Sequence, residues 1–242
     1  MEEKLLRNVS LRSRRVVTIA GFIFLLAVLV VSIPIAEAAV VVEMMHISQG
    51  ARVQATVPQL QNGPHPRILS DANELFRNVV LTAYRRFEQA ALETRTDPHL
   101  PEHMKDALTF RADYEVFRND SQFLSLGQTV YQYTGGAHGM SFLTAFTIQL
   151  PTGHLCKLAD LFVVGTNYRD RLTAIVRREG ASRGLPLWDF RGVKEDSGFY
   201  LTDDGLVLFF QPYEIAPYSE GIVKILVRYR DLTNMLAFKS DR

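Results

Sequence analysis

Apolar residues recur at helical spacing in two stretches of the chain. In residues 70–93 they form one stripe, which predicts a helix lying on a sheet. Ser70 or Asp71 would cap this helix, with Glu74 as a capping-box partner. A second amphipathic helix is predicted over residues 167–180. The stripe of the first helix consists of Ala72, Leu75, Phe76, Val79, Val80, Ala83, Phe87, Ala90 and Ala91.

Elsewhere the pattern is typical of β-strands, with alternating apolar and polar residues or short apolar runs. The turn Asp203-Asp204-Gly205 between two such runs predicts a hairpin. Residues 58–69 contain three prolines, and residues 94–106 are polar and interrupted by prolines, so both segments are predicted to be loops. Residues 232–238 are predicted to form a short helix. The predicted strands are residues 40–47, 51–57, 108–116, 123–133, 140–150, 199–201, 206–210 and 222–229.

The order of these elements is strands, helix, meander, helix, meander. This grouping predicts an α+β fold with largely antiparallel sheets. We expect two helix-plus-antiparallel-meander units packed together, one over residues 40–155 and one over residues 156–242, preceded by a signal or anchor segment.

Residues 1–38 have the three parts of a targeting segment. A basic stretch ends at Arg14-Arg15, an apolar run extends from Val16 to Ile35, and the small-residue pattern Ala36-Glu37-Ala38 follows. The segment is interpreted as a signal peptide or, if it is not cleaved, as a membrane anchor. In both cases the remainder of the protein is expected outside the cytoplasm, and only this segment would contact the membrane.

The charge balance excludes one class of partner. The first 38 residues carry five basic and three acidic side chains, so residues 39–242 have a net charge of −1 out of the chain total of +1. A nearly neutral body lacks the basic surface that nucleic acid requires, and no nucleic-acid partner is expected.

The sequence gives little indication of a metal site or of a catalytic nucleophile. Cys156 is the single cysteine, which rules out an intrachain disulfide, and its apolar neighbours indicate a small packed side chain more than a reactive thiol. His99 and His103 have helical spacing for a metal, but the prolines around them indicate loop histidines. No cofactor or metal is expected, and the common hydrolase and nucleotide-binding motifs are absent from the sequence.

The loop Gly135-Gly136-Ala137-His138-Gly139 has two interpretations. Its glycines permit positive φ and close approach, so a ligand could bind there against Gly135, Gly136 and His138. The structural alternative, which we favour, is a tight corner in which His138 is hydrogen-bonded to the backbone. A catalytic base at His138 would lack an identifiable nucleophile.

Residues 211–221 form the other distinctive segment. Pro212 and Pro217 stiffen a loop that carries Tyr213, Glu214 and Tyr218. Amphipathic aromatic side chains on a rigid loop lose little entropy on binding and are common in protein and sugar recognition. Tyr213, Glu214, Pro217 and Tyr218 are therefore candidate ligand-binding residues, while the structural alternative has both tyrosines packed over the sheet edge.

These segments together resemble one family. They are Tyr-Thr-Gly-Gly-Ala-His-Gly at residues 133–139, Leu-Ala-Asp-Leu-Phe at residues 158–162, and residues 199–206 leading into residues 212–218. Their order resembles the extracellular domain of RsiV-type anti-sigma factors, a region that also accompanies the catalytic domain of PdaC-type peptidoglycan deacetylases. The resemblance implies an α+β fold and, in RsiV-type proteins, lysozyme binding.

The resemblance leads to a functional hypothesis. The 15 residues before Val16 are too few for a sigma-binding domain and no deacetylase domain follows, so the chain is expected to be the extracellular module alone. We expect an exported, non-enzymatic binding module of the cell envelope whose partner is a muramidase-like protein or a wall glycan. The alternatives are an envelope hydrolase centred on His138 and a purely structural envelope protein.

Overall fold

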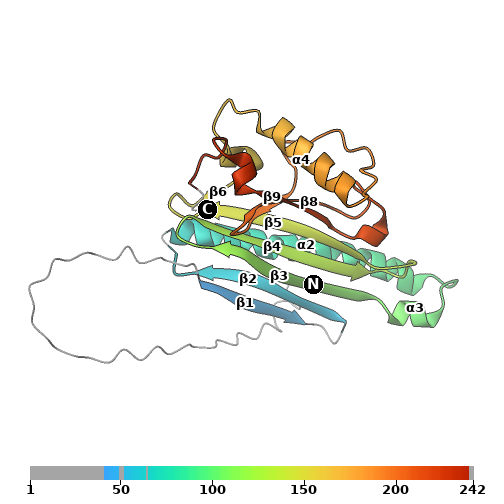
Figure 1. The fold of residues 1–242 in the computed structure, drawn as a ribbon. Helices are drawn as coiled ribbons and strands as arrows, with labels where there is room; N and C mark the ends of the chain where they lie inside the picture. Colours follow the sequence, from blue (N-terminus) through green and yellow to red (C-terminus); the bar gives the residue numbers. More distant parts are fainter. Residues whose placement is uncertain (1–40, 49–51, 64, 240–242) are drawn as a thin grey trace, which may run out of the picture.

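The computed structural model describes residues 41–48, 52–63 and 65–239, so the predicted targeting segment lies outside the described residues (Figure 1). Two sheets organise the chain, and the predicted α+β fold with largely antiparallel sheets is confirmed. The larger sheet has the order β1 (Val41–Ser48), β2 (Val53–Gln61), β3 (Thr109–Asn119), β4 (Phe123–Tyr133), β5 (Met140–Gln149), β6 (His154–Leu155). The smaller sheet has the order β7 (Phe199–Leu201), β8 (Gly205–Phe210), β9 (Val223–Arg228).

Within the larger sheet, β2 and β3 are the parallel neighbours. The long helix α2 (Pro66–Thr96) connects them, which fits the rule that parallel strands need a crossover. The other neighbouring strands are antiparallel, and β3, β4 and β5 form the predicted meander. A bulge between Val116 and Arg118 shifts the register of β3 against β4.

The predicted helix over residues 70–93 is longer at both ends than expected. It begins at Pro66, because proline fits the first helical turn, and neither Ser70 nor Asp71 caps it. The expected loop over residues 58–69 is correspondingly wrong: β2 continues through Pro58 to Gln61. Pro58 is tolerated there although it faces Met44 of β1 in the antiparallel ladder.

Two other short expectations are also wrong. Residues 94–106 are not only a loop, because α2 continues to Thr96 and a short helix α3 (Glu102–Asp106) follows Pro101. The expected helix over residues 232–238 is absent: a 3₁₀ turn, η3, spans Tyr229–Leu232, and Leu236 forms a bridge with Phe162.

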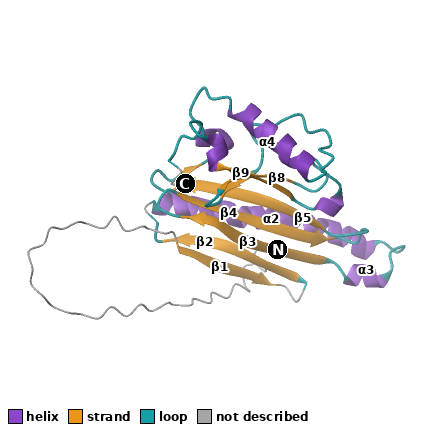
Figure 2. Cartoon of the chain, in the orientation of Figure 1, coloured by secondary structure: helices purple, strands orange, loops and turns teal. Residues whose placement is uncertain are grey.

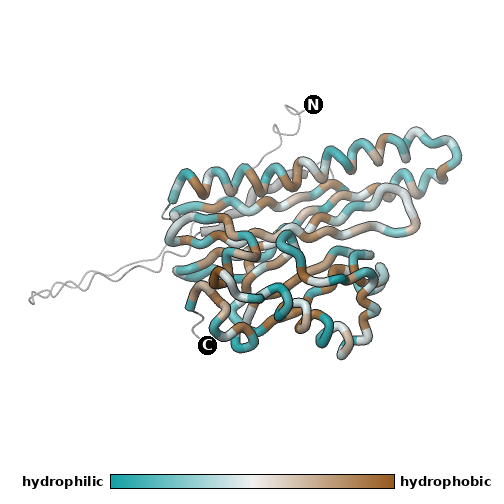
Figure 3. Tube along the Cα trace, turned by 90° about the horizontal axis from the view of Figure 1, so that it is seen from above, coloured by the Kyte–Doolittle hydropathy of each residue, from teal (hydrophilic) through white to brown (hydrophobic). Residues whose placement is uncertain are grey.

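The two faces of the larger sheet are covered by different elements (Figure 2). Seen from above, α2 lies on one side of the sheet and the residues after β6 lie on the other (Figure 3). The helix buries Phe76, Val80 and Phe87 against the sheet. On the other face, β7 crosses β3, β4 and β5, and helix α4 (Tyr168–Ser182) covers the outer side of the small sheet.

Two large hydrophobic cores lie on the two faces of the larger sheet. The first core consists of buried residues from Ala55 to Leu150, all on the α2 face. The second core lies between α4 and the small sheet and includes Leu172, Ile175 and Val176 of the predicted second helix. Within the described residues, no helix is both long enough and apolar enough to cross a membrane.

Candidate binding site

The two loops that carry the predicted ligand-binding residues meet in space. The β4–β5 turn brings His138 against Tyr218, with ring centroids 3.8 Å apart and ring planes within 19° of parallel. Tyr213 stacks on Tyr218 at 5.8 Å, and its hydroxyl lies 3.4 Å from Nε2 of His138. Three rings from two segments therefore form one cluster, which we call the aromatic surface (His138, Tyr213 and Tyr218).

The members of the aromatic surface differ in how firmly they are held. Tyr218 is half-buried, and its hydroxyl donates a 2.7 Å hydrogen bond to the Gly139 carbonyl. Tyr213 is 50% exposed, and its backbone has a φ of 68°, a conformation that costs a non-glycine residue free energy. His138 is exposed as well. Tyr218 therefore anchors the cluster, while Tyr213 and His138 present their rings to solvent.

The glycines of the β4–β5 turn differ in whether a side chain would fit at their positions. Gly135 has a φ of 95°, and a Cβ on it would lie 2.6 Å from Thr94 of α2. A Cβ on Gly139 would collide with the Tyr131 ring, whereas a Cβ on Gly136 would meet nothing within 4 Å. Packing explains Gly135 and Gly139, and Gly136 is the exposed member that leaves backbone accessible beside His138.

The loop with the two tyrosines is braced from within. The Glu214 carboxylate accepts a 2.8 Å hydrogen bond from the Gln211 backbone N–H, so this predicted ligand residue also closes its own turn. Pro212 is buried and Pro217 is half-buried, and neither presents a polar group to a ligand. The rigidity expected from the two prolines thus comes from packing and from the Glu214 bond together.

Gln211 fixes this loop to the larger sheet. Its side-chain amide donates to the Leu143 carbonyl at 2.7 Å and accepts from the Leu143 N–H at 3.1 Å. This pair of bonds resembles one rung of a β-ladder and positions the tyrosine loop beside the β4–β5 turn.

The site offers little for covalent catalysis. His138 Nδ1 lies 3.1 Å from the Gly139 carbonyl, so a proton on Nδ1 would leave Nε2 as the acceptor for the Tyr213 hydroxyl. Among the residues that the structure describes, no serine or cysteine side chain is hydrogen-bonded to His138. The hydrogen bond of His138 to backbone is the feature that the structural interpretation of this loop expected.

The other histidines and the cysteine lie elsewhere. His103 is in α3 and His99 is in the preceding turn, and the described part of the chain holds no group of three metal-binding side chains. His154 is paired with Asp160 at 2.9 Å; this bond, together with the Lys157 N–H, lowers the pKa of the Asp160 carboxyl. Burial, with the nearby Asp160 charge, raises the pKa of the Cys156 thiol to about 11, so the thiol is protonated at neutral pH.

The sequence pattern selected both loops but not their contact. His138 and Tyr218 are 80 positions apart, and no spacing rule links them. Gln211 was missed because a glutamine at a strand end carries no signal of its own. The glycines and prolines of the two segments predict rigid loops, but they do not predict which other segments these loops contact in space.

Two family models match parts of the chain. The model of DUF3298, a family of unknown function, matches residues 159–230, which contain the tyrosine loop. The model described as deacetylase PdaC matches residues 48–141, which contain the β4–β5 turn. The aromatic surface therefore lies where the two matched regions meet. These matches support the family context of the sequence resemblance, while the assignment to RsiV-type anti-sigma factors stays a prediction.

Solved structures show the same fold. A DUF3298 family protein from Bacteroides fragilis superposes with a TM-score of 0.64 at 18% identity, covering 84% of this chain and 96% of that one. A DUF3298 family protein from Pseudomonas aeruginosa superposes with a TM-score of 0.56 at 18% identity, covering 81% and 94%.

A curated relative is similar over a shorter stretch. An esterase of Mycobacterium tuberculosis, Rv3036c, is 32% identical over 96 residues, which are 38% of this chain and 42% of the esterase. The aligned stretch spans less than half of either protein.

Proposed function

We propose that this chain is a non-enzymatic binding module of the cell envelope and that its aromatic surface binds a glycan of the cell wall. The observation that carries the proposal is the stack of His138, Tyr218 and Tyr213, which presents ring faces at the meeting of two braced loops. The match of residues 48–141 to a deacetylase-associated region supports an extracytoplasmic setting.

The geometry suits a sugar ring. A pyranose offers a face of C–H groups with hydroxyls around its edge, and an aromatic ring has a negative face that attracts such C–H groups. The exposed Tyr213 ring provides that face, while the exposed His138 ring lies beside it for hydroxyl contacts. Because the bonds of Tyr218 and Glu214 already order these loops, little conformational entropy remains to be lost on binding.

Substitutions at Tyr213 test the proposal. Tyr213→Ala removes the exposed ring and should weaken binding to purified peptidoglycan about tenfold or more, the range of an aromatic anchor. Tyr213→Phe is the matched control: it keeps the ring face and loses only the 3.4 Å contact with His138, so it should bind nearly as the parent does. Co-sedimentation with peptidoglycan measures both variants, and thermal unfolding confirms that they fold. Equal binding by Tyr213→Ala and the parent would refute the glycan site.

A lysozyme-like protein is the partner that the sequence resemblance implies. The same exposed tyrosine on a stiff loop would serve as a protein anchor. Calorimetric titration with lysozyme distinguishes the two partners. If the chain binds lysozyme but not peptidoglycan, and Tyr213→Ala weakens the lysozyme complex, the aromatic surface is a protein-binding site and not a glycan-binding site.

Hydrolysis is the second candidate function, favoured by the 96-residue similarity to an esterase. It would require His138 as a base. Turnover of p-nitrophenyl butyrate that is lost in His138→Ala would establish hydrolysis and overturn the non-enzymatic part of the proposal.

A further inference from the structure

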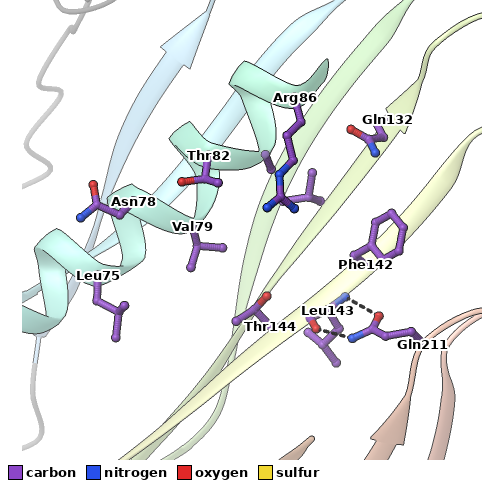
Figure 4. A pocket seen from close by; sticks show the side chains of 12 residues that line it. Leu75, Asn78, Val79, Thr82, Arg86, Gln132, Phe142, Leu143, Thr144 and Gln211 are labelled. Carbon is purple, nitrogen blue, oxygen red and sulfur yellow. Dashed lines mark hydrogen bonds between the residues drawn. The ribbon is translucent and has the colours of Figure 1, made fainter. Parts of the chain in front are cut away.

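A groove opens between α2 and the Met140 end of β5 (Figure 4). At the other end of β5 the helix and strand are in contact, with the rings of Phe76 and Phe146 5.0 Å apart. Toward Met140 the helix packs instead on β3, with Tyr84 and Phe87 against Phe110, and Phe142 of β5 is left 38% exposed. The groove has a volume of about 610 Å³, within the range of small-molecule sites.

Half of the residues that line the groove are apolar, and one is charged. The helix wall is the half-buried row Leu75, Val79 and Ala83, which are spaced four residues apart. Arg86 is the single charged residue of the lining, and Figure 4 shows its side chain pointing from α2 into the space above the sheet. Within the described part of the chain, no carboxylate is paired with Arg86. The other polar residues of the lining are Asn78, Thr82, Gln132, Thr144 and Gln211.

The rim of the groove is fixed in a way that disfavours a peptide. Gln211 occupies both the N–H and the carbonyl of Leu143, the backbone groups through which an added strand would pair with β5. The row of Leu75, Val79 and Ala83 has no donor or acceptor side chain and suits an alkyl chain, while the polar lining side chains can contact a polar head group. An occupant without backbone polar groups fits better.

We propose that this groove binds an amphipathic carboxylate, a single apolar chain whose acid group pairs with Arg86. The chain would lie along the row from Leu75 to Ala83, and the carboxylate would accept hydrogen bonds from the guanidinium. From Leu75 to Arg86 the helix rises about 16 Å, which matches a medium-length alkyl chain. The site shares no residue with the aromatic surface, so it stands or falls independently of the glycan proposal.

The probe is dodecanoate, titrated below its micelle concentration into the full chain, with dodecanol as the uncharged analogue. We expect dodecanoate to bind about five- to tenfold more tightly than dodecanol, the worth of a charge-assisted pair at a partly open site. Arg86→Gln should remove this preference and leave the affinity for dodecanol unchanged. Arg77→Gln is the matched control, because Arg77 is on the same helix but does not line the groove.

A second variant tests the apolar wall. Ala83→Phe fills the groove from the helix and should abolish binding of both probes, while circular dichroism and thermal unfolding verify the fold. A photoreactive dodecanoate analogue should label peptides that contain Leu75–Arg86 or Phe142–Thr144. Labelling confined to residues 16–35, equal affinity for both probes, or binding that Ala83→Phe does not reduce would each overturn the proposal.

Discussion

The two faces of the larger sheet differ in how apolar packing and buried hydrogen bonds hold the elements that cover them. The face under α2 is sealed mainly by apolar contact, as in the cluster of Phe76, Phe87 and Phe110. Its directional bonds lie near the two ends of the helix, where Asn73 pairs with both backbone groups of Leu60 and Thr94 donates to the Thr134 carbonyl. The face under β7–β9 has directional bonds in its fully buried interior: the hydroxyls of Ser125 and Thr147 are 2.8 Å apart, and Ser125 Oγ accepts the Leu201 N–H at 2.9 Å. Apolar contact fixes how deeply an element packs, whereas directional bonds fix where it packs.

This difference relates to function. The aromatic surface needs the tyrosine loop to meet the β4–β5 turn in one register, and the bonds from Ser125 and Gln211 supply that register. On the α2 face the corresponding bonds join the helix to Leu60 of β2 and to Thr134 after β4, and the groove lies between the helix and β5. Substitutions on each face should therefore fail in different ways.

The largest expected effect is on the α2 face. Phe76→Ala removes a ring that is 0% exposed and packed on Phe146, and should lower the free energy of unfolding by about 3–5 kcal/mol. Urea unfolding measures this loss. The matched control Leu92→Ala, on the same helix at 55% exposure, should change stability little. Similar losses in both variants would mean that α2 is held by something other than its apolar stripe.

Arg118 comes next, on the opposite face. Its guanidinium donates to Asp120 at 2.6 Å and to the Tyr229 hydroxyl at 3.0 Å, and it lies 5.2 Å from the centre of the Phe123 ring. Arg118→Met keeps much of the packing and loses these bonds. We expect a loss of about 2 kcal/mol, less than for a fully buried pair because Asp120 is 38% exposed.

The loss at Arg118 should depend on pH. Burial alone would raise the pKa of Asp120, but the N–H groups of Phe123 and Gln122 and the Arg118 guanidinium outweigh it and lower the pKa. A lowered folded-state pKa stabilises the protein above the unfolded value of about 4, and this stabilisation is lost as the pH falls through the folded value. The stability difference between the parent and Arg118→Met should therefore narrow below about pH 4. A constant difference down to pH 2 would show that packing, not charge, is what Arg118 contributes.

Ser125→Ala has a smaller expected effect. It leaves the Leu201 N–H and the Thr147 hydroxyl without their partner in a fully buried place, which should cost about 1–2 kcal/mol. Ser141→Ala, a half-buried serine on β5, is the control and should be nearly neutral. Because Leu201 belongs to β7, the variant should also raise amide exchange in the small sheet more than under α2. Uniform exchange changes would contradict the assignment of register to this bond.

Local pattern predicted the elements better than their ends. The apolar stripe of residues 70–93 predicted α2, yet Leu75, Val79 and Ala83 are half-exposed although their spacing matched that of the buried Phe76. Periodicity indicates which side of a helix is apolar, but not whether the partner strand covers that side completely. The apolar periodicity of residues 70–93 therefore could not predict the groove.

The candidate site was predicted in its parts and missed as a whole. His138, Tyr213 and Tyr218 were selected because glycine and proline marked their loops, but their stacking depends on contacts such as that of Gln211 with Leu143, 68 positions apart. Bonds between distant side chains leave no periodic trace in a sequence. A site that forms where two segments far apart in the sequence meet is for this reason harder to predict than a helix on a sheet.

The smallest expected effect compares two polar residues of one strand. Gln128 and Ser125 are both 0% exposed on β4, but Gln128 faces α2. Its amide donates to the Phe76 carbonyl at 3.2 Å, a group that the helix already uses, and its Oε1 has no hydrogen-bond partner among the described residues. A buried acceptor without a partner destabilises the folded state.

Gln128→Met retains the length and volume of the side chain and removes the unpaired acceptor. The lost Phe76 bond and the relieved desolvation should nearly cancel, so stability should stay the same or rise by up to about 1 kcal/mol. Gln128→Ala is the control for volume and should lose about 2 kcal/mol, because it leaves a cavity under α2. Urea unfolding of the two variants beside Ser125→Ala then tests the comparison directly. If Gln128→Met loses as much as Ser125→Ala, the amide has a partner of its own, and the α2 face depends on directional bonds as the other face does.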